Sequence, residues 1–196
     1  MLRDTGRLVL TADEPSLAPQ APHLARGLTD VGLIGGPIDG SATAFYAGPK
    51  LLSLVSFTGC AVSVATGPDN AAGAAFTHVR FVGTYRAPRL RYGRNTRPPR
   101  CPHCRSRLET WRTLLHPERD ITCPSCARRI SPPDWDWRLQ GGIGRVFIDV
   151  EEVFPGEAVP TATLMQALAA VSGGTWRYFY LQRYAADAAG VQLGAG

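Results

Sequence analysis

The sequence predicts an α+β fold, with a mostly antiparallel β body, one C-terminal helix and an inserted cysteine-bearing module. Three observations predict this class. Short runs of β-branched and aromatic residues, separated by Gly- and Pro-containing breaks, begin at Thr43. One strong helical pattern occurs late in the chain, over residues 161–171. Between two strand patterns lies a segment rich in Arg, Pro and Cys, which we expect to be inserted into the body.

Residues 1–40 are predicted to be a loosely structured N-terminal segment. Four prolines and a group of glycines punctuate it, and such residues mark turns. We expect at most a short helical turn at residues 23–31.

Residues 41–97 are predicted to form the first part of the body and to end in an Arg-rich connector. We expect strands or extended segments at residues 44–46, 51–57, 61–65, 75–85 and 88–92. The segment 51–57 alternatively begins a helix, because its leucines also match a helical period.

Residues 132–183 are predicted to be the second part of the body, built as strand, helix and strand. The first strand spans residues 145–153, and residues 184–196 follow as a flexible tail. The closing strand, 175–183, places three aromatic residues on one face, for which core packing is the expected role.

The predicted helix has a clear beginning and end. Leu164, Leu168 and Val171 form its buried stripe. Pro160 suits the first turn, and Gly173-Gly174 ends the helix.

Alternation in strand 145–153 separates its apolar and acidic residues. Val146, Ile148 and Val150 share one face, whereas Asp149 and Glu151 lie on the other. Paired carboxylates such as these, with Glu152 beside them, can serve acid–base chemistry or a second metal. No histidine, lysine or second acidic cluster can be matched to them, so we expect a face that points into water.

Four cysteines form two C-x-x-C motifs that are typical of a metal site. Cys101 and Cys104 enclose Pro-His, Cys123 and Cys126 enclose Pro-Ser, and eighteen residues separate the two motifs. Thiolates at i and i+3 of a tight turn supply two corners of a tetrahedron, and a second such turn supplies the other two. The pattern therefore predicts one structural zinc ion bound by Cys101, Cys104, Cys123 and Cys126.

These motifs resemble the knuckles of a zinc ribbon, and the resemblance covers residues 98–131. It implies a zinc ion and a small local fold, while zinc ribbons stabilise many unrelated proteins. Ribbon knuckles often place Gly directly after the second cysteine, where this chain has Arg105 and Ala127.

An alternative interpretation of the first motif is redox chemistry. Cys101-Pro102-His103-Cys104 also resembles the active-site tetrapeptide of DsbA-type thiol oxidoreductases. That motif should follow a buried apolar strand, but a polar, arginine-rich stretch precedes it here. We therefore rank a thiol–disulfide oxidoreductase below a metal site.

Composition and charge limit the class of protein. The 196 residues, 44% of them hydrophobic, suffice for a packed core. The N-terminus lacks the apolar stretch of a signal peptide, and the uncharged run 51–68 contains too many polar residues to favour a membrane span. Zinc-type cysteine spacing without an export signal predicts a cytoplasmic protein. We expect the fifth cysteine, Cys60, to be a small buried hydrophobic residue.

Positive charge is concentrated in the middle of the chain. The net charge is +5, yet residues 77–138 contain fourteen arginines and five acidic residues. The run preceding the first cysteine motif can grip phosphates and stack on bases, or it is a solvated connector. Its candidate partner-binding residues are Tyr85, Arg86, Arg89, Arg91, Tyr92, Arg94, Arg97 and Arg100.

The sequence favours a non-catalytic accessory protein. It would dock onto a nucleic acid or an acidic protein surface through the arginine-rich segment beside the zinc ribbon. The alternative is a maturation or assembly factor for a client metalloenzyme. No recognised catalytic motif is present, which makes an enzyme the least favoured interpretation.

Overall fold

A computed structural model describes residues 5–58 and 76–183. Its main element is a six-stranded sheet in the order β12-β1-β10-β5-β3-β2, with every pair antiparallel. The strands are β1 Gly6–Ala12, β2 Ile34–Pro37, β3 Ala44–Ala47, β5 His78–Gly83, β10 Val146–Val153 and β12 Trp176–Gln182. The predicted α+β class with a mostly antiparallel body is confirmed.

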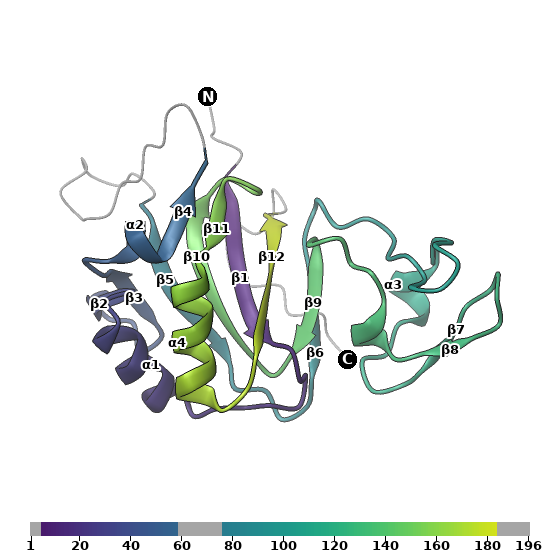
Figure 1. The fold of residues 1–196 in the computed structure, drawn as a ribbon, viewed down its shortest axis with the longest axis horizontal. Coiled ribbons are helices and arrows are strands. Elements are labelled where there is room, and N and C mark those ends of the chain that lie inside the picture. The colour runs from purple at the N-terminus through teal and green to yellow at the C-terminus, as the bar shows by residue number, and fades with distance from the viewer. Residues whose placement is uncertain (1–4, 59–75, 184–196) are drawn as a thin grey trace.

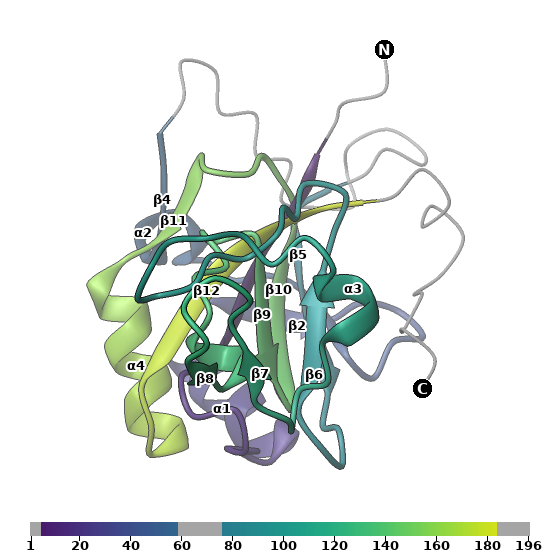
Figure 2. The same cartoon turned by 90° about the vertical axis from the view of Figure 1, so that its right-hand side faces the viewer.

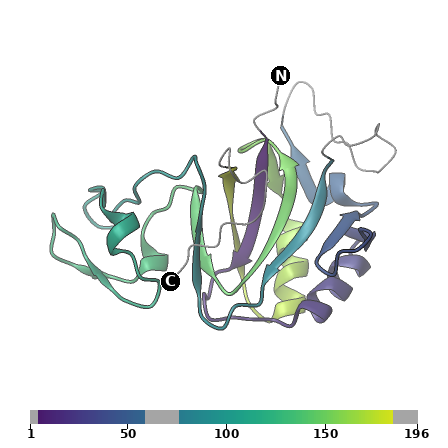
Figure 3. The ribbon, with the colours of Figure 1, turned by 180° about the vertical axis from the view of Figure 1, so that it is seen from behind.

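Two helices cover one face of this sheet (Figures 1 and 3). They are α1, Ala21–Asp30, and α4, Ala162–Ser172. Leu24 and Leu28 of α1 and Leu164 and Leu168 of α4 are fully buried in the main core. The two helices approach closely at Gly27, where a Cβ would overlap Val171. The main core therefore lies between the helices and the sheet.

The predicted C-terminal helix is confirmed almost to the residue. Thr161 caps it, because the side-chain oxygen of Thr161 accepts a hydrogen bond from the Leu164 amide. Gly173 ends it in a left-handed conformation with φ of 77°. The expectation that Pro160 lies in the first helical turn is wrong, because α4 begins at Ala162 and Pro160 ends β11, Ala158–Pro160, which pairs with β4, Val55–Phe57. The segment before β4 is the short helix α2, Leu51–Leu54, so residues 51–57 combine both predicted conformations.

The expectation that residues 1–40 are loosely structured is wrong. They contain β1, α1 and β2, and β1 is paired on both sides, with β10 and β12. Leu8, Val9 and Leu10 are buried on both faces of the sheet, so β1 lacks the polar–apolar alternation that marks a strand with one wet face.

A two-stranded layer crosses the second face of the sheet. It consists of β6, Arg89–Tyr92, and β9, Gly141–Gly144. Glycines allow this approach, since a Cβ at Gly142 would overlap the Phe179 ring and one at Gly144 would overlap the Thr11 hydroxyl.

Residues 93–140 lie between β6 and β9 and form a separate small lobe on the right of Figure 1. The lobe contains α3, Trp111–Leu114, β7, Ile121–Thr122, β8, Arg129–Ile130, and a 3₁₀ turn, Pro132–Asp134. We call residues 93–140 the cysteine module. The predictions for Cys60, for a strand at 61–65 and for a tail at 184–196 fall outside the described residues.

None of the helices in the described part of the chain is long and apolar enough to cross a membrane.

Candidate metal centre

The fold brings all four predicted cysteine ligands together. The sulfur of Cys101 lies 3.7 Å from that of Cys126, and the sulfur of Cys104 lies 3.7 Å from that of Cys123. All four sulfur atoms lie within 4.8 Å of one another. Tetrahedral metal–sulfur bonds of about 2.3 Å place neighbouring sulfurs about 3.8 Å apart. The four cysteines therefore fit a four-coordinate metal ion.

Each C-x-x-C motif folds into the same tight turn. The Cys101 amide donates to the Ser106 carbonyl at 2.9 Å, and the Arg105 amide donates to the Cys101 carbonyl at 3.0 Å. In the second motif the amides of Cys123 and Ala127 make the equivalent bonds, at 2.8 and 2.9 Å. This repeated backbone pattern directs both cysteine side chains of a turn toward the same point.

The residue after the second cysteine of each turn has a left-handed backbone. Arg105 has φ of 63° and Ala127 has φ of 57°. These are the two positions at which the sequence lacks the glycine that is frequent in zinc-ribbon knuckles. The turn geometry is thus reached without glycine, at a conformational cost of about 1 kcal/mol for each residue.

Ser106 is a neighbour of the site that sequence reasoning missed. Its hydroxyl oxygen lies 3.1 Å from the Cys104 sulfur and 3.3 Å from the Cys123 sulfur. The Ser106 hydroxyl lowers the pKa of the Cys104 thiol. Burial raises the pKa of Cys123, but Ser106 and the amides of Cys126 and Ser125 outweigh it and bring this pKa to about 6.

The fourth thiol resists ionisation. The Arg128 amide lowers the pKa of Cys126, but burial and the neighbouring sulfurs of Cys123, Cys104 and Cys101 raise it to about 11. Four thiolates this close repel one another, and a divalent cation is the group that stabilises all four charges together. The chemistry of the donor set therefore also fits a metal ion.

An aromatic core supports the module from within. Trp111, Trp135 and Trp137 are buried together with Cys101 and Leu108 in a cluster separate from the main core. The rings of Trp111 and Trp137 meet edge to face at 5.5 Å, and the Trp137 indole donates to the Pro132 carbonyl at 3.0 Å. The cysteines are thus anchored on a small hydrophobic core of their own.

The predicted partner-binding residues differ in how far they are exposed to solvent. Arg91 points away from solvent and donates two hydrogen bonds to Asp149, at 2.6 and 2.7 Å. Burial lowers the pKa of Arg91, but Asp149 outweighs it and raises this pKa. Arg91 is therefore committed to an internal ion pair, and the residues that remain exposed are Arg86, Arg89, Tyr92, Arg94 and Arg97.

The two predicted tyrosines have different surroundings. Tyr85 is partly buried against Phe147, and Arg89 lies over its ring at 5.7 Å. Tyr92 is 39% exposed and meets Trp111 edge to face, at 5.1 Å between ring centres. Arg112, which the sequence analysis did not select, lies 4.3 Å over the Trp111 ring, where α3 lies beside β6 (Figure 2).

The expectation that Asp149 and Glu151 point into water is wrong. Both are buried, at 0% and 2% exposure. Arg7 lies within 3.7 Å of each carboxylate, and Arg183 donates to Glu151 at 2.7 Å. Burial raises the pKa of Glu151, but Arg7 and Arg183 outweigh it and lower this pKa. The layer formed by β6 and β9 covers this face, which the sequence pattern of β10 alone does not reveal.

A second concentration of charge lies beside the first cysteine turn. Arg100 pairs through its backbone with Asp136, and the Arg105 guanidinium lies 3.0 Å from the Asp136 carboxylate. Arg138 donates from its guanidinium to the Pro98 carbonyl at 3.1 Å. Burial, and then the charges of nearby arginines, lower the pKa of Arg138.

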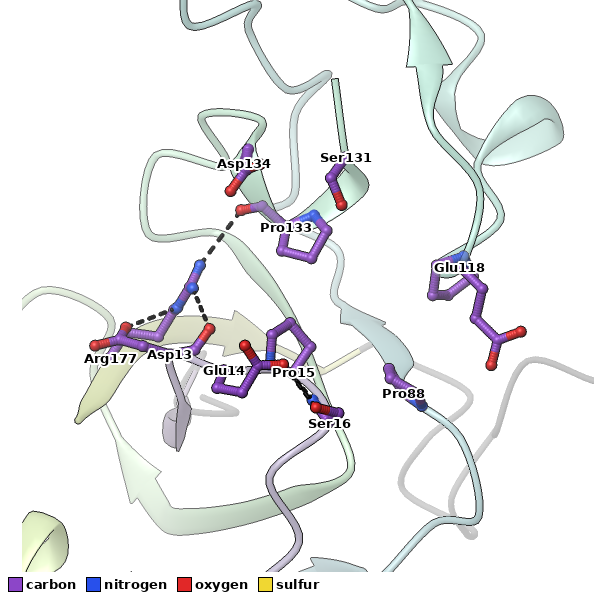
Figure 4. A pocket seen from close by; sticks show the side chains of 11 residues that line it. Asp13, Glu14, Pro15, Ser16, Pro88, Glu118, Ser131, Pro133, Asp134 and Arg177 are labelled. Carbon is purple, nitrogen blue, oxygen red and sulfur yellow. Dashed lines mark hydrogen bonds and ion pairs between the residues drawn. The ribbon is translucent and has the colours of Figure 1, made fainter. Parts of the chain in front are cut away.

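An acidic cleft of about 410 Å3 opens between the module and the end of β1 (Figure 4). Arg177 lies in it and donates to the Asp13 carboxylate and to the Pro133 carbonyl. The other side chains of the cleft are carboxylates, prolines and serines, namely Glu14, Pro15, Ser16, Pro88, Pro117, Glu118, Ser131 and Asp134. This lining is mainly polar, whereas small-molecule sites are lined predominantly by apolar side chains.

Fold and site together define an α+β protein with an inserted cluster of four cysteines that could hold a metal ion. Comparisons with protein-family models, with curated proteins and with solved structures found no match to this chain.

Proposed function

We propose that this chain is a non-catalytic zinc-binding accessory protein that docks onto an anionic partner, either a nucleic acid or an acidic protein surface. One observation carries the proposal. Four sulfur atoms lie at tetrahedral spacing within a module whose surface is rich in exposed arginines. A metal-held scaffold fixes the arginine backbones, so docking costs less conformational entropy than it would for a disordered basic segment.

Zinc is the metal we propose, with residues 98–131 of the cysteine module forming a zinc ribbon. Four thiolates are the donor set that structural zinc sites prefer, and they complete the coordination shell with no open position. A complete shell supports a structural role for the ion. The cysteines then stabilise the fold of the module through the metal ion, and the arginines contact the partner.

Metal and partner content of the purified protein test this proposal. We expect one zinc per chain and co-purification of nucleic acid or an acidic protein that high salt removes. Charge reversal at Arg89 and Arg97, both exposed, should abolish this retention while leaving the zinc content unchanged. The matched control makes the same charge change at two exposed arginines outside this segment, Arg26→Glu and Arg119→Glu. Undiminished retention in the double variant would contradict docking through this segment.

A second candidate function, delivery of metal to a client enzyme, is favoured by the exposure of Cys104. An exposed thiolate is open to attack by an acceptor, which a fully buried site resists. Zinc transfer to a metal-free acceptor protein distinguishes the two functions. Transfer that is faster than release to buffer supports delivery, whereas retention of zinc over hours supports the structural role.

A further inference from the structure

Three backbone segments bring five arginines around one carboxylate beside the first cysteine turn. Arg100 is the central residue and forms antiparallel bridges with Arg107 on one side and with Asp136 on the other. Arg105 forms an ion pair with Asp136, and the Arg138 amide donates to the second oxygen of the same carboxylate at 3.0 Å. We call Arg97, Arg100, Arg105, Arg107, Arg138 and Asp136 the arginine cluster.

The pairing of Arg100 with Arg107 is unfavourable by itself. The hydrogen bonds that flank this pair are Leu108 N–H to Pro99 O and Cys101 N–H to Ser106 O, at 3.0 and 2.9 Å. Arg100 and Arg107 therefore form a non-hydrogen-bonded antiparallel pair, in which directly opposite side chains lie closest. Like charges at such positions destabilise a protein.

Nothing in the described part of the chain neutralises this charge. Over residues 5–58 and 76–183, the guanidinium groups of Arg97, Arg100 and Arg107 form no ion pair. Asp136 is already bonded to Arg105 and Arg138. Burial lowers the pKa of Arg138, and the nearby charges of Arg100, Arg97 and Arg107 lower it further, which agrees with several positive charges lying close together. Such an excess is stabilised when an anion binds.

We propose that the arginine cluster binds the phosphodiester backbone of a nucleic acid, with Arg97, Arg100 and Arg107 as the phosphate contacts. The inference rests on the proposed docking function and names its partner and its contact site. Arginine forks match phosphate oxygens in pairs, and adjacent arginines suit consecutive phosphates of a polymer. The first cysteine turn fixes the position of the cluster, since Arg100 and Arg105 flank Cys101 and Cys104.

Planar groups on the cysteine module and on the adjoining strand β6 favour a nucleic acid over an acidic protein. The exposed Tyr92 ring and the Arg112 guanidinium over Trp111 both present surfaces on which bases stack. Arg112 also lies 6.0 Å from the Tyr92 ring, so the two groups belong to one surface. Carboxylate side chains of a protein partner gain nothing from stacking.

Binding of the full chain to a labelled oligodeoxythymidylate of twenty nucleotides tests the inference. The variant carries Arg97→Gln and Arg107→Gln, and the control carries the same charge change at exposed residues outside the cluster, Arg26→Gln and Arg119→Gln. We expect the cluster variant to lose about tenfold or more in affinity and the control less than about threefold. The slope of log K against log salt concentration should be smaller in magnitude by about 1.4 in the cluster variant, because two phosphate contacts are lost. Zinc content serves as the folding check for each protein.

Removing the lone carboxylate should have the opposite effect. In Asp136→Asn the side-chain oxygen can still accept from the Arg138 amide, but the charge that opposes phosphate is gone. We expect affinity for the oligonucleotide to rise about twofold to fivefold. A loss of affinity with unchanged zinc content would overturn the inference.

The remaining outcomes separate this inference from the proposed function. If both double variants lose affinity equally, binding follows general charge and the cluster is not the site, while docking stands. If polyglutamate or tripolyphosphate binds as tightly as the oligonucleotide, a nucleic-acid backbone is not the partner. If the unmodified protein binds none of these anions and retains no partner on purification, the docking function itself fails.

Discussion

Ala127 shows what the cysteine turn demands of a single residue. Its left-handed backbone, with φ of 57°, is one that glycine adopts without steric cost. We expect Ala127→Gly to raise the free energy of unfolding of the module by about 0.5–1 kcal/mol, since the larger freedom of glycine in the unfolded chain offsets part of the gain. Chelator titrations of the two proteins measure the difference. Arg105→Gly is a poorer test, because it also removes the ion pair to Asp136.

A second prediction at the residue scale concerns the proposed metal ligands. Cys126→Ser replaces a thiolate with a poor zinc ligand, so we expect the variant to lose its metal and to unfold locally. Ser125→Ala changes an exposed residue of the same turn and should keep one zinc per chain. Metal analysis of both proteins decides the matter, and full zinc content in Cys126→Ser would remove this residue from the ligand set.

Glu151 connects stability to pH. Arg7 and Arg183 lower its pKa below the ordinary value of 4.5, so its folded form binds a proton less readily than its unfolded form. Its contribution is therefore complete above pH 4.5 and is lost as the pH falls through the lowered pKa. Glu151→Gln should lose about 1–3 kcal/mol of stability at pH 7 and show a flatter decline below pH 4.5.

Denaturant unfolding at several pH values tests this expectation. Metal release in acid affects the native protein and the variant alike, so the difference between their curves isolates Glu151. The exposed Glu109, changed to Gln, is the matched control and should leave the curve unchanged. Equal slopes below pH 4.5 for the native protein and Glu151→Gln would contradict the ion-pair account.

At the scale of elements, helix α4 offers the clearest test of packing. Leu168 is fully buried between α4 and the sheet, and its truncation leaves a cavity in the main core. We expect Leu168→Ala to cost about 2–5 kcal/mol of unfolding free energy. The exposed Ala170 of the same helix, changed to Ser, should cost less than about 1 kcal/mol. A negligible effect at Leu168 would mean that the helix does not pack on the sheet.

Local patterns predicted some elements and not others, for identifiable reasons. Helix α4 begins after the capping residue Thr161 and ends at Gly173. Apolar and acidic residues alternate in the sequence of β10, so both elements could be predicted. The cysteine cluster could be predicted because metal chemistry restricts ligand spacing. Strand β1 could not, because its identity depends on partners near the other end of the chain. The burial of Asp149 depends likewise on β6, which crosses its face.

At the scale of the whole molecule, the main core and the core of the cysteine module should respond differently to metal removal. Three of the four tryptophans, Trp111, Trp135 and Trp137, lie in the module core, and Trp176 lies in the main core. We expect a chelator to shift tryptophan emission strongly while the circular dichroism of α1 and α4 changes little. Loss of helical signal in step with the fluorescence change would show that the two cores unfold as one unit.

The pairing of β1 also has a consequence for how the protein folds during synthesis. Its neighbours in the sheet, β10 and β12, follow the cysteine module in the sequence and leave the ribosome after it, whereas the cysteines that meet lie at most 25 positions apart. Domains begin to fold as they emerge. The two cysteine turns can therefore form while β1, which is already synthesised, is still unpaired. The basic surface of the cysteine module can therefore be complete during synthesis before the six-stranded sheet is.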